Sequence, residues 1–147
     1  ENNPVTDASL EKLSGFQELK SLFLSDTKIT GVTLGKLAGM PRLHELTLDR
    51  NAIKDDALRH LSGLRNQLTF LTVGPDITDA GAEHIARLTK LERLDLTSAP
   101  VTNEGLDVIV KAMPNLKELQ LFYTDVSSDK MGEIEKNRPK ILLQAAY

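Results

Sequence analysis

The chain of 147 residues contains no cysteine and no tryptophan, and its only aromatic side chains are four phenylalanines and two tyrosines. Without cysteine the chain forms no disulfide, has no thiolate chemistry and holds no zinc through sulfur. Its apolar runs are only a few residues long, which excludes a membrane-spanning helix. Because a cysteine-free chain is compatible with either redox compartment, composition leaves the location open.

The chain also lacks a large excess of either positive or negative charge. The chain has 18 basic and 21 acidic residues and a net charge of -3. No strong basic field exists to attract a nucleic-acid backbone or an anionic membrane. We therefore expect neither a nucleic-acid partner nor membrane insertion. A content of 40% hydrophobic and 27% charged residues is typical of one globular domain.

What the sequence does contain is the phrase Leu-x-x-Leu-x-Leu, repeated five times. The copies are Leu19-Leu22-Leu24, Leu43-Leu46-Leu48, Leu68-Leu71-Val73, Leu91-Leu94-Leu96 and Leu116-Leu119-Leu121. The first leucines are 24, 25, 23 and 25 residues apart. A nearly fixed period in this range predicts a solenoid, in which each unit buries its apolar face against the next.

Residue spacing divides each unit into a strand and a helix. In residues 43–48 the last two leucines alternate with polar residues, which predicts a short strand with one buried face. Leu58, Leu61 and Leu64 then form one stripe of a helix. Equivalent stripes are Leu10/Leu13/Phe16, Leu34/Leu37/Met40, Ala82/Ile85/Leu88, Leu106/Ile109/Met113 and Met131/Ile134.

Helix starts are marked by hydroxyl or carboxylate side chains, which accept hydrogen bonds from free amides of the first turn. The marked segments are Val5-Thr6-Asp7, Ile29-Thr30, Ile77-Thr78-Asp79, Val101-Thr102-Asn103 and Val126-Ser127-Ser128. In the unit from Leu43 the candidate is Asp55. A small residue precedes the first apolar helix residue at Ser9, Thr33, Ala57, Gly81 and Gly105. We expect neighbouring backbone to approach closely there; Lys130 breaks the pattern.

A strand followed by a helix in every unit predicts parallel strands joined by right-handed crossovers. Parallel strands lie about 4.8 Å apart, whereas helices with their side chains are roughly 10 Å wide. Stacking both along one axis bends the stack and puts the strands inside the curve.

Residues 77–82, Ile-Thr-Asp-Ala-Gly-Ala, resemble the Ile-Thr-Asp-x-Gly-Leu repeats of bacterial and F-box-associated members of the leucine-rich-repeat superfamily. They are also similar to the Gly-Ala-x-x-Leu-Ala units of bacterial effector repeats. The resemblance extends from Val5 to at least Ile134. It implies an α/β fold, a right-handed leucine-rich-repeat solenoid with a parallel β-sheet on the concave face and α-helices on the convex face.

We expect a single domain over residues 1–147. It would comprise a partial unit at 1–18, repeats that begin at residues 19, 43, 68, 91 and 116, and a C-terminal capping strand at about 141–144. Pro139 ends the last helix, which leaves residues 141–144 to pair beside Leu119. Val5-Thr6-Asp7 matches a segment that follows a strand in the other repeats. We therefore expect that strand to lie upstream of Glu1, in a native protein that continues N-terminally.

The repeats depart from the family pattern in their turns. The resemblance implies an Asn or Cys three residues after the last strand leucine, where it satisfies buried turn backbone. This position holds Thr27, Asn51, Asp76, Ala99 and Thr124. The methyl group of Ala99 makes no such hydrogen bond. The third repeat is one residue shorter and carries Gly74-Pro75, which predicts a local kink.

Strand positions beside the buried leucines point out of the concave face. Aromatic anchors on a rigid sheet are typical of recognition surfaces, although single exposed aromatics are also ordinary. The candidate partner-binding residues are Phe23, Glu45, Thr47, Asp49, Phe70, Thr72, Arg93, Asp95, Glu118, Gln120, Phe122 and Tyr123. Because Arg93 and Glu118 share a column on adjacent strands, we expect them to form a surface ion pair.

The sequence predicts no catalytic residue, no cofactor and no metal. Carboxylates such as Asp95 lie on an open sheet without the enclosure that acid–base chemistry needs. His60 and His84 fall one repeat apart, with backbones about 10 Å apart and no third ligand, which favours a solvated pair.

The function most consistent with this pattern is a non-catalytic protein–protein interaction module that recognises a protein partner on its concave face. Two alternatives remain. The chain would be an assembly subunit docked by its ends or its convex helices, or an appended domain of a larger enzyme. The sequence names neither the partner nor the compartment.

Overall fold

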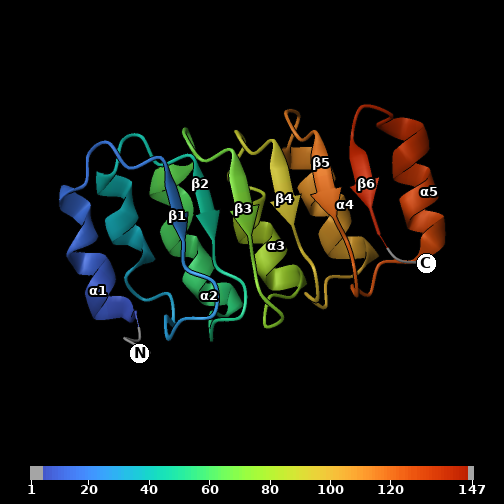
Figure 1. Cartoon of the computed structure of the whole chain (residues 1–147). Coiled ribbons are helices and arrows are strands. Elements are labelled where there is room, and N and C mark those ends of the chain that lie inside the picture. The colour runs from blue at the N-terminus through green and yellow to red at the C-terminus, as the bar shows by residue number, and fades with distance from the viewer. Residues whose placement is uncertain (1–4, 146–147) are drawn as a thin grey trace.

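A computed structural model describes residues 5–145. Six short parallel strands form one sheet in chain order, from β1 to β6 (Figure 1). They are β1 Ser21–Phe23, β2 Glu45–Thr47, β3 Phe70–Thr72, β4 Arg93–Asp95, β5 Glu118–Gln120 and β6 Leu142–Gln144. The last strand, β6, pairs with β5 where the sequence places a final strand.

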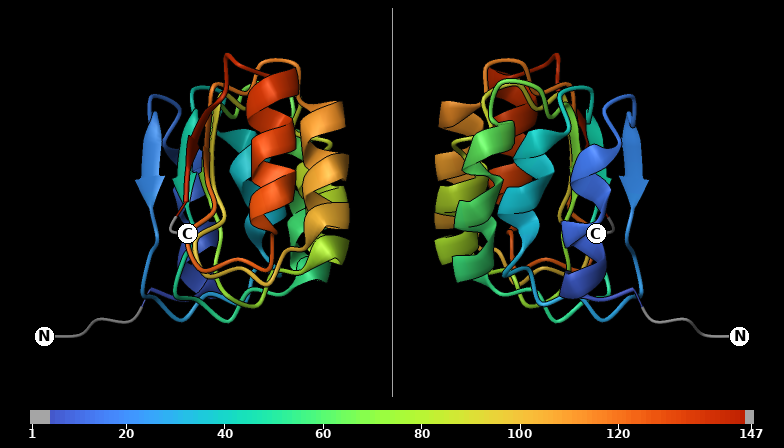
Figure 2. Two further views of the ribbon diagram at one scale, coloured as in Figure 1. Left: turned by 90° about the vertical axis from the view of Figure 1, so that its right-hand side faces the viewer. Right: turned by 90° about the vertical axis from the view of Figure 1, so that its left-hand side faces the viewer.

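Helical segments connect the strands and cover one face of the sheet. They are α1 Asp7–Glu11, η1 Leu13–Gly15, η2 Leu34–Gly39, α2 Asp55–Leu58, η3 Arg59–Leu64, α3 Asp79–Ile85, α4 Asn103–Ala112 and α5 Ser128–Asn137, where η denotes a 3₁₀ helix. Seen along the stack, both ends bend toward the strand side (Figure 2). The sheet is therefore the concave face and the helices are the convex face of an α/β solenoid, as predicted.

Apolar residues three apart occur in both kinds of helix, as Leu34 and Leu37 do in the 3₁₀ helix η2 and Ala82 and Ile85 do in the α-helix α3. A 3₁₀ helix has 3.0 residues per turn, so residues three apart stand above one another. Leu34, Leu37 and Met40 have this spacing; Leu34 begins η2, and Met40 is its C-cap. In α4 the spacing widens to four between Ile109 and Met113, which suits the 3.6 residues per turn of an α-helix. All of these side chains are fully buried.

The core is a stack of aligned leucines. The strand register places Leu46, Leu71, Leu94 and Leu119 opposite one another, and each is at most 1% exposed. Each leucine therefore packs on its equivalents in the repeats before and after it. Burial in one repeat depends on the presence of both neighbours.

A second set of contacts joins the repeats where the helices begin. Asp79, the first residue of α3, accepts hydrogen bonds from the backbone N–H (2.8 Å) and the hydroxyl (2.7 Å) of Thr102 in the next repeat. The same contact joins Asp7 to Thr30, Asp55 to Thr78 and Asn103 to Ser127. We call these four contacts the helix-start ladder. They pair backbone N–H groups that no helix hydrogen bond satisfies.

The small residues that the sequence marks lie beside this ladder. A Cβ at Gly81 would lie 2.6 Å from Ile77 Cγ2 and 3.3 Å from the carboxyl carbon of Asp55. A Cβ at Gly105 would lie 2.8 Å from the carboxyl carbon of Asp79. The expectation that neighbouring backbone approaches closely is wrong at these glycines, because the approaching groups are side chains.

The ladder is interrupted once. Gly31 stands where the other repeats have an acceptor, and Lys54 stands where they have a hydroxyl. Gly31 has a φ of +94°, and a Cβ there would lie 2.7 Å from the Cβ of Ala57, so a methyl group fills the space that a carboxylate fills elsewhere. The prediction of Asp55 as N-cap is wrong. Lys54 is the N-cap of α2, and Asp55 is its first helical residue.

The turns after the strands use a left-handed backbone residue. Four such residues have φ between 53° and 66°: Asp26, Arg50, Ser98 and Tyr123. The turn of the third repeat contains Pro75, whose ring fixes φ near −65°. Within residues 5–145, the turn after β3 contains no residue with a left-handed backbone. This turn is also one residue shorter than the others.

Asn51 makes the turn contacts that the family pattern implies. Its amide nitrogen donates to the carbonyls of Leu24 (2.7 Å) and Leu48 (3.0 Å), and its oxygen accepts from the N–H of Thr27 (3.0 Å). Ala99 occupies the equivalent position with a fully buried methyl group. The side chain at this position therefore bridges neighbouring turns only where it carries a hydrogen-bonding group.

Candidate partner-binding surface

Side chains on the open face of the sheet form three columns, because the register aligns equivalent residues of successive repeats. The first column is Ser21, Glu45, Phe70, Arg93, Glu118 and Leu142. The second is Phe23, Thr47, Thr72, Asp95, Gln120 and Gln144. The third, at the start of the turns, is Ser25, Asp49, Gly74, Thr97 and Phe122.

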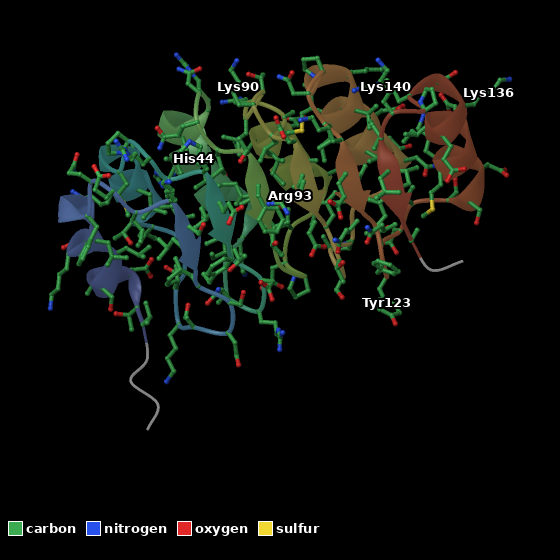
Figure 3. The ribbon with its side chains drawn as sticks, turned by 45° about the horizontal axis from the view of Figure 1, so that its top comes forward. His44, Lys90, Arg93, Tyr123, Lys136 and Lys140 are labelled. Atoms are coloured by element: carbon green, nitrogen blue, oxygen red, sulfur yellow. The ribbon has the colours of Figure 1, made fainter. Side chains whose placement is uncertain are left out.

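Arg93 is held in the first column by an aromatic ring and a carboxylate. Its guanidinium carbon lies 4.6 Å from the ring centre of Phe70 on the neighbouring strand. Its Nη2 donates to Glu45 Oε1 at 2.9 Å, two strands away. The hydroxyl of Ser21 donates to the other oxygen of Glu45 at 2.7 Å. Figure 3 shows Arg93 over the middle of the sheet.

The predicted ion pair between Arg93 and Glu118 is therefore wrong. The two residues do share a column, but stacking on Phe70 directs the guanidinium toward β2 and Glu45. Glu118 instead accepts hydrogen bonds from Gln144 (3.0 Å) and Gln120 (3.4 Å). No ion pair of Glu118 exists among residues 5–145.

Two predicted contact residues are hardly accessible. Thr47 and Thr72 are only 8% and 7% exposed, so the expectation that they face solvent is wrong. Each has strand neighbours on both sides whose side chains flank it. The hydroxyl of Thr47 also accepts from the N–H of Leu24 at 3.2 Å. These threonines form the floor of the surface.

The aromatic residues differ in accessibility. Phe23 and Tyr123 are 67% and 79% exposed, whereas Phe70 and Phe122 are partly buried. Phe23 lies on the edge strand β1, and Tyr123 lies in the turn after β5, beyond the end of the sheet (Figure 3). The four rings are therefore spread along the face and do not form one cluster.

A groove crosses the third column, and sequence reasoning did not predict it. Its volume is about 530 Å³. It is lined by Asp49, Arg50, Thr72, Gly74, Pro75, Asp95, Thr97, Ser98, Gln120 and Phe122. We call it the Gly74 groove, because the lack of a side chain at Gly74 leaves the third column open between Asp49 and Thr97. The signal in the sequence is a glycine where every other repeat carries a side chain.

The carboxylates at this groove differ in their partners. Asp49 accepts from the hydroxyl of Ser25 and forms an ion pair with Arg50 at 3.4 Å. Asp95 accepts from the N–H of Thr97 at 2.9 Å. Within residues 5–145 no cation forms an ion pair with Asp95. The groove therefore has one carboxylate already paired with a cation and one that is not.

Away from the sheet, the two helix histidines do not form a ligand set. Residues 5–145 contain no group of three or more His, Cys, Asp or Glu side chains placed to hold a metal ion. Nδ1 of His84 is buried without a hydrogen-bond partner. No helix in the same part of the chain is long and apolar enough to cross a membrane.

Comparison with known proteins agrees with this architecture. Two leucine rich repeat models match the sequence, one over residues 1–53 and one over residues 87–110. The structure of internalin C2 from Listeria monocytogenes is 27% identical, with a TM-score of 0.64, and the match covers 92% of this chain and 55% of that one. No curated protein sequence matches the chain.

Two further structures share the fold at lower identity. A leucine-rich-repeat protein of Leptospira interrogans is 24% identical with a TM-score of 0.65 over 91% of this chain and 33% of its own. TLR13, in a complex with ssRNA13, is 21% identical with a TM-score of 0.64 over 100% of this chain and 21% of its own. This chain spans about half or less of these proteins. It has the leucine-rich-repeat fold, and the matches support its place in the leucine-rich-repeat superfamily.

Proposed function

We propose that this chain is a non-catalytic protein-interaction module that binds a protein partner on its concave sheet. The observation that carries the proposal is the arrangement of Arg93, Phe70 and Glu45, which fixes a charged and an aromatic side chain in the middle of an open face. A side chain ordered before binding loses less conformational entropy on binding. Aromatic residues and arginine are also the residue types that contribute most to protein interfaces.

The repeat chemistry supports a narrower family placement. We propose that these repeats belong to the subtype with helices on the convex side and Ile-Thr-Asp-x-Gly-Leu units. The aspartate and the glycine of that motif interact across repeats here, as Asp55 does with Gly81 and Asp79 with Gly105. In this chain the small residue of the motif thus leaves room for the aspartate of the repeat before it.

A pair of double variants tests which face binds. Phe70→Ala with Arg93→Ala removes the central concave side chains, while the leucines behind them stay. Arg59→Ala with Val108→Ala is the matched control, because it removes an exposed arginine and an exposed apolar side chain from the helices. Circular dichroism and urea unfolding establish that both variants remain folded.

Wild-type chain immobilised on resin captures candidate partners from the source cells, and the purified partner is then titrated against each variant by calorimetry. We expect the concave variant to bind at least about tenfold more weakly and the control to bind like wild type. If the control loses affinity while the concave variant keeps it, the chain is docked by its helices, and the assembly-subunit alternative replaces this proposal.

A further inference from the structure

The Gly74 groove and the Arg93 site lie side by side on the same sheet and have related chemistry. At the Arg93 site, a carboxylate (Glu45) and a phenyl ring (Phe70) hold a guanidinium between them. The groove is lined by a carboxylate (Asp95) and a phenyl ring (Phe122), and the cation in its lining, Arg50, pairs with Asp49. At the Arg93 site the space between carboxylate and ring is thus occupied by a guanidinium, whereas in the Gly74 groove the corresponding space is open.

Three observations define which ligand would fit the Gly74 groove. The volume of about 530 Å³ falls within the range of roughly 300–1,000 Å³ that is typical of ligand sites. Asp95 has no ion-pair partner among residues 5–145, so its charge is available. An aromatic ring adds attraction for a cation within about 6 Å of its centre.

Arg50, the cation that lines the groove, does not pair with Asp95. The side chain of Arg50 is 75% exposed and pairs with Asp49. Arg93 is directed away by Phe70 and Glu45. Both native arginines near the groove are therefore engaged with other carboxylates.

We infer that the Gly74 groove binds a cationic side chain, arginine above all, from an extended segment of the protein partner. This inference rests on the proposed concave-face function and adds the chemistry of one partner residue. The guanidinium enters above Gly74, pairs with Asp95 and contacts the ring of Phe122. The floor is Thr72 and Gly74, neither of which carries charge.

The test uses two short peptides that differ only in charge. One is acetyl-Ala-Ala-Arg-Ala-Ala-amide, and the other replaces the arginine by citrulline, which has nearly the same shape and no charge. Each is titrated into ¹⁵N-labelled chain, and amide chemical shifts are followed by NMR. We expect saturable shifts at Gly74, Asp95 and Thr97, with the citrulline peptide binding roughly threefold to tenfold more weakly.

Two variants localise the effect. Asp95→Asn removes the charge but keeps an oxygen that can accept from the N–H of Thr97, so the turn is retained. Gly74→Ser fills the floor, and a Cβ there meets its nearest atom, the backbone nitrogen of Arg50, at an ordinary 3.4 Å. Serine also stands at the equivalent position in the first repeat, as Ser25. We expect either variant to abolish the preference for arginine over citrulline.

The inference is overturned if both peptides bind wild type equally, if the shifts map to the helices, or if neither peptide binds. Its failure can be told apart from failure of the proposed function. A partner that loses affinity through the change at Phe70 and Arg93 but not through Asp95→Asn keeps concave-face recognition and removes the arginine subsite.

Discussion

The carboxylate of Asp79 occupies the space that any side chain on Gly105 would need, because a Cβ at Gly105 would lie 2.8 Å from the carboxyl carbon of Asp79. The same relationship joins Asp55 to Gly81. From this position Asp79 accepts hydrogen bonds from the N–H and the hydroxyl of Thr102. The glycine in one repeat is thus required by the aspartate in the repeat before it.

Gly105→Ala should therefore destabilise the chain by about 1 to 3 kcal/mol through overpacking, as judged by urea unfolding. Gly132→Ala is the matched control, since a Cβ at that helical glycine meets no atom within 4 Å. The control should gain about 0.5 to 1 kcal/mol, because alanine is the better helix former. Removing the carboxylate with Asp79→Ala should lessen the effect of Gly105→Ala. Additive effects would contradict the relationship.

Leu71→Ala should lower the free energy of unfolding by about 2 to 5 kcal/mol, because it opens a cavity in the aligned leucine stack. Leu71 is fully buried, whereas Phe23 retains 67% exposure. Phe23→Ala is therefore the comparison, with an expected change within about 0.5 kcal/mol. Equal losses for the two variants in chemical denaturation would show that the buried stack does not dominate stability.

The partner of Arg93 can be identified by two double-mutant cycles. Arg93→Ala combined with Glu45→Gln should show a coupling energy of about 0.2 to 1 kcal/mol, typical of an exposed pair. Arg93→Ala combined with Glu118→Gln should show none, because within residues 5–145 Glu118 accepts hydrogen bonds from Gln120 and Gln144 and not from Arg93. A coupling at Glu118 instead of Glu45 would restore the pairing that the sequence predicts.

Asp7 should make stability depend on acid. Burial raises the pKa of its carboxyl, but hydrogen bonds from Thr30, Gly31 and Thr33 outweigh burial and leave the pKa below its ordinary value of 3.8. A lowered folded-state pKa contributes stability that is fully present above 3.8 and is lost as the pH falls through the folded-state value.

Urea midpoints of wild type and Asp7→Asn at pH values above and below this window test the point. Wild type should be the more stable protein near neutral pH, and the difference should shrink as Asp7 becomes protonated. A difference that stays constant across the acid range would mean that the charge of Asp7 contributes nothing.

Much of the fold could be predicted, because the leucine spacing encodes both the strand period and the bend of the stack. Helix type could not be predicted, since a spacing of three occurs both in the 3₁₀ helix η2 (Leu34, Leu37) and in the α-helix α3 (Ala82, Ile85). The N-cap at Lys54 could not be predicted either, because its side chain makes no capping hydrogen bond that a sequence motif would signal. Contacts between repeats are invisible to a pattern read along one repeat.

The surface was harder to predict than the core for a related reason. Column membership follows from the register, and Arg93 and Glu118 share one column as predicted. Which neighbour Arg93 contacts depends on stacking against Phe70 and on the reach of a long side chain past one strand. The Gly74 groove arises because Gly74 has no side chain. A prediction based on the side chains that each position carries does not include such an empty space. The candidate contact residues themselves stay a prediction.

The single gap in the helix-start ladder divides the stack into two segments, which contain different numbers of ladder contacts. On one side Asp7 ties the first helix to Thr30, and on the other side three successive contacts run from Asp55 to Ser127. Across the gap, between Gly31 and Lys54, sheet pairing and apolar packing remain. In native-state hydrogen exchange we expect the segment before this seam to open as a unit of its own, so that the chain behaves as two cooperative blocks that share one continuous sheet.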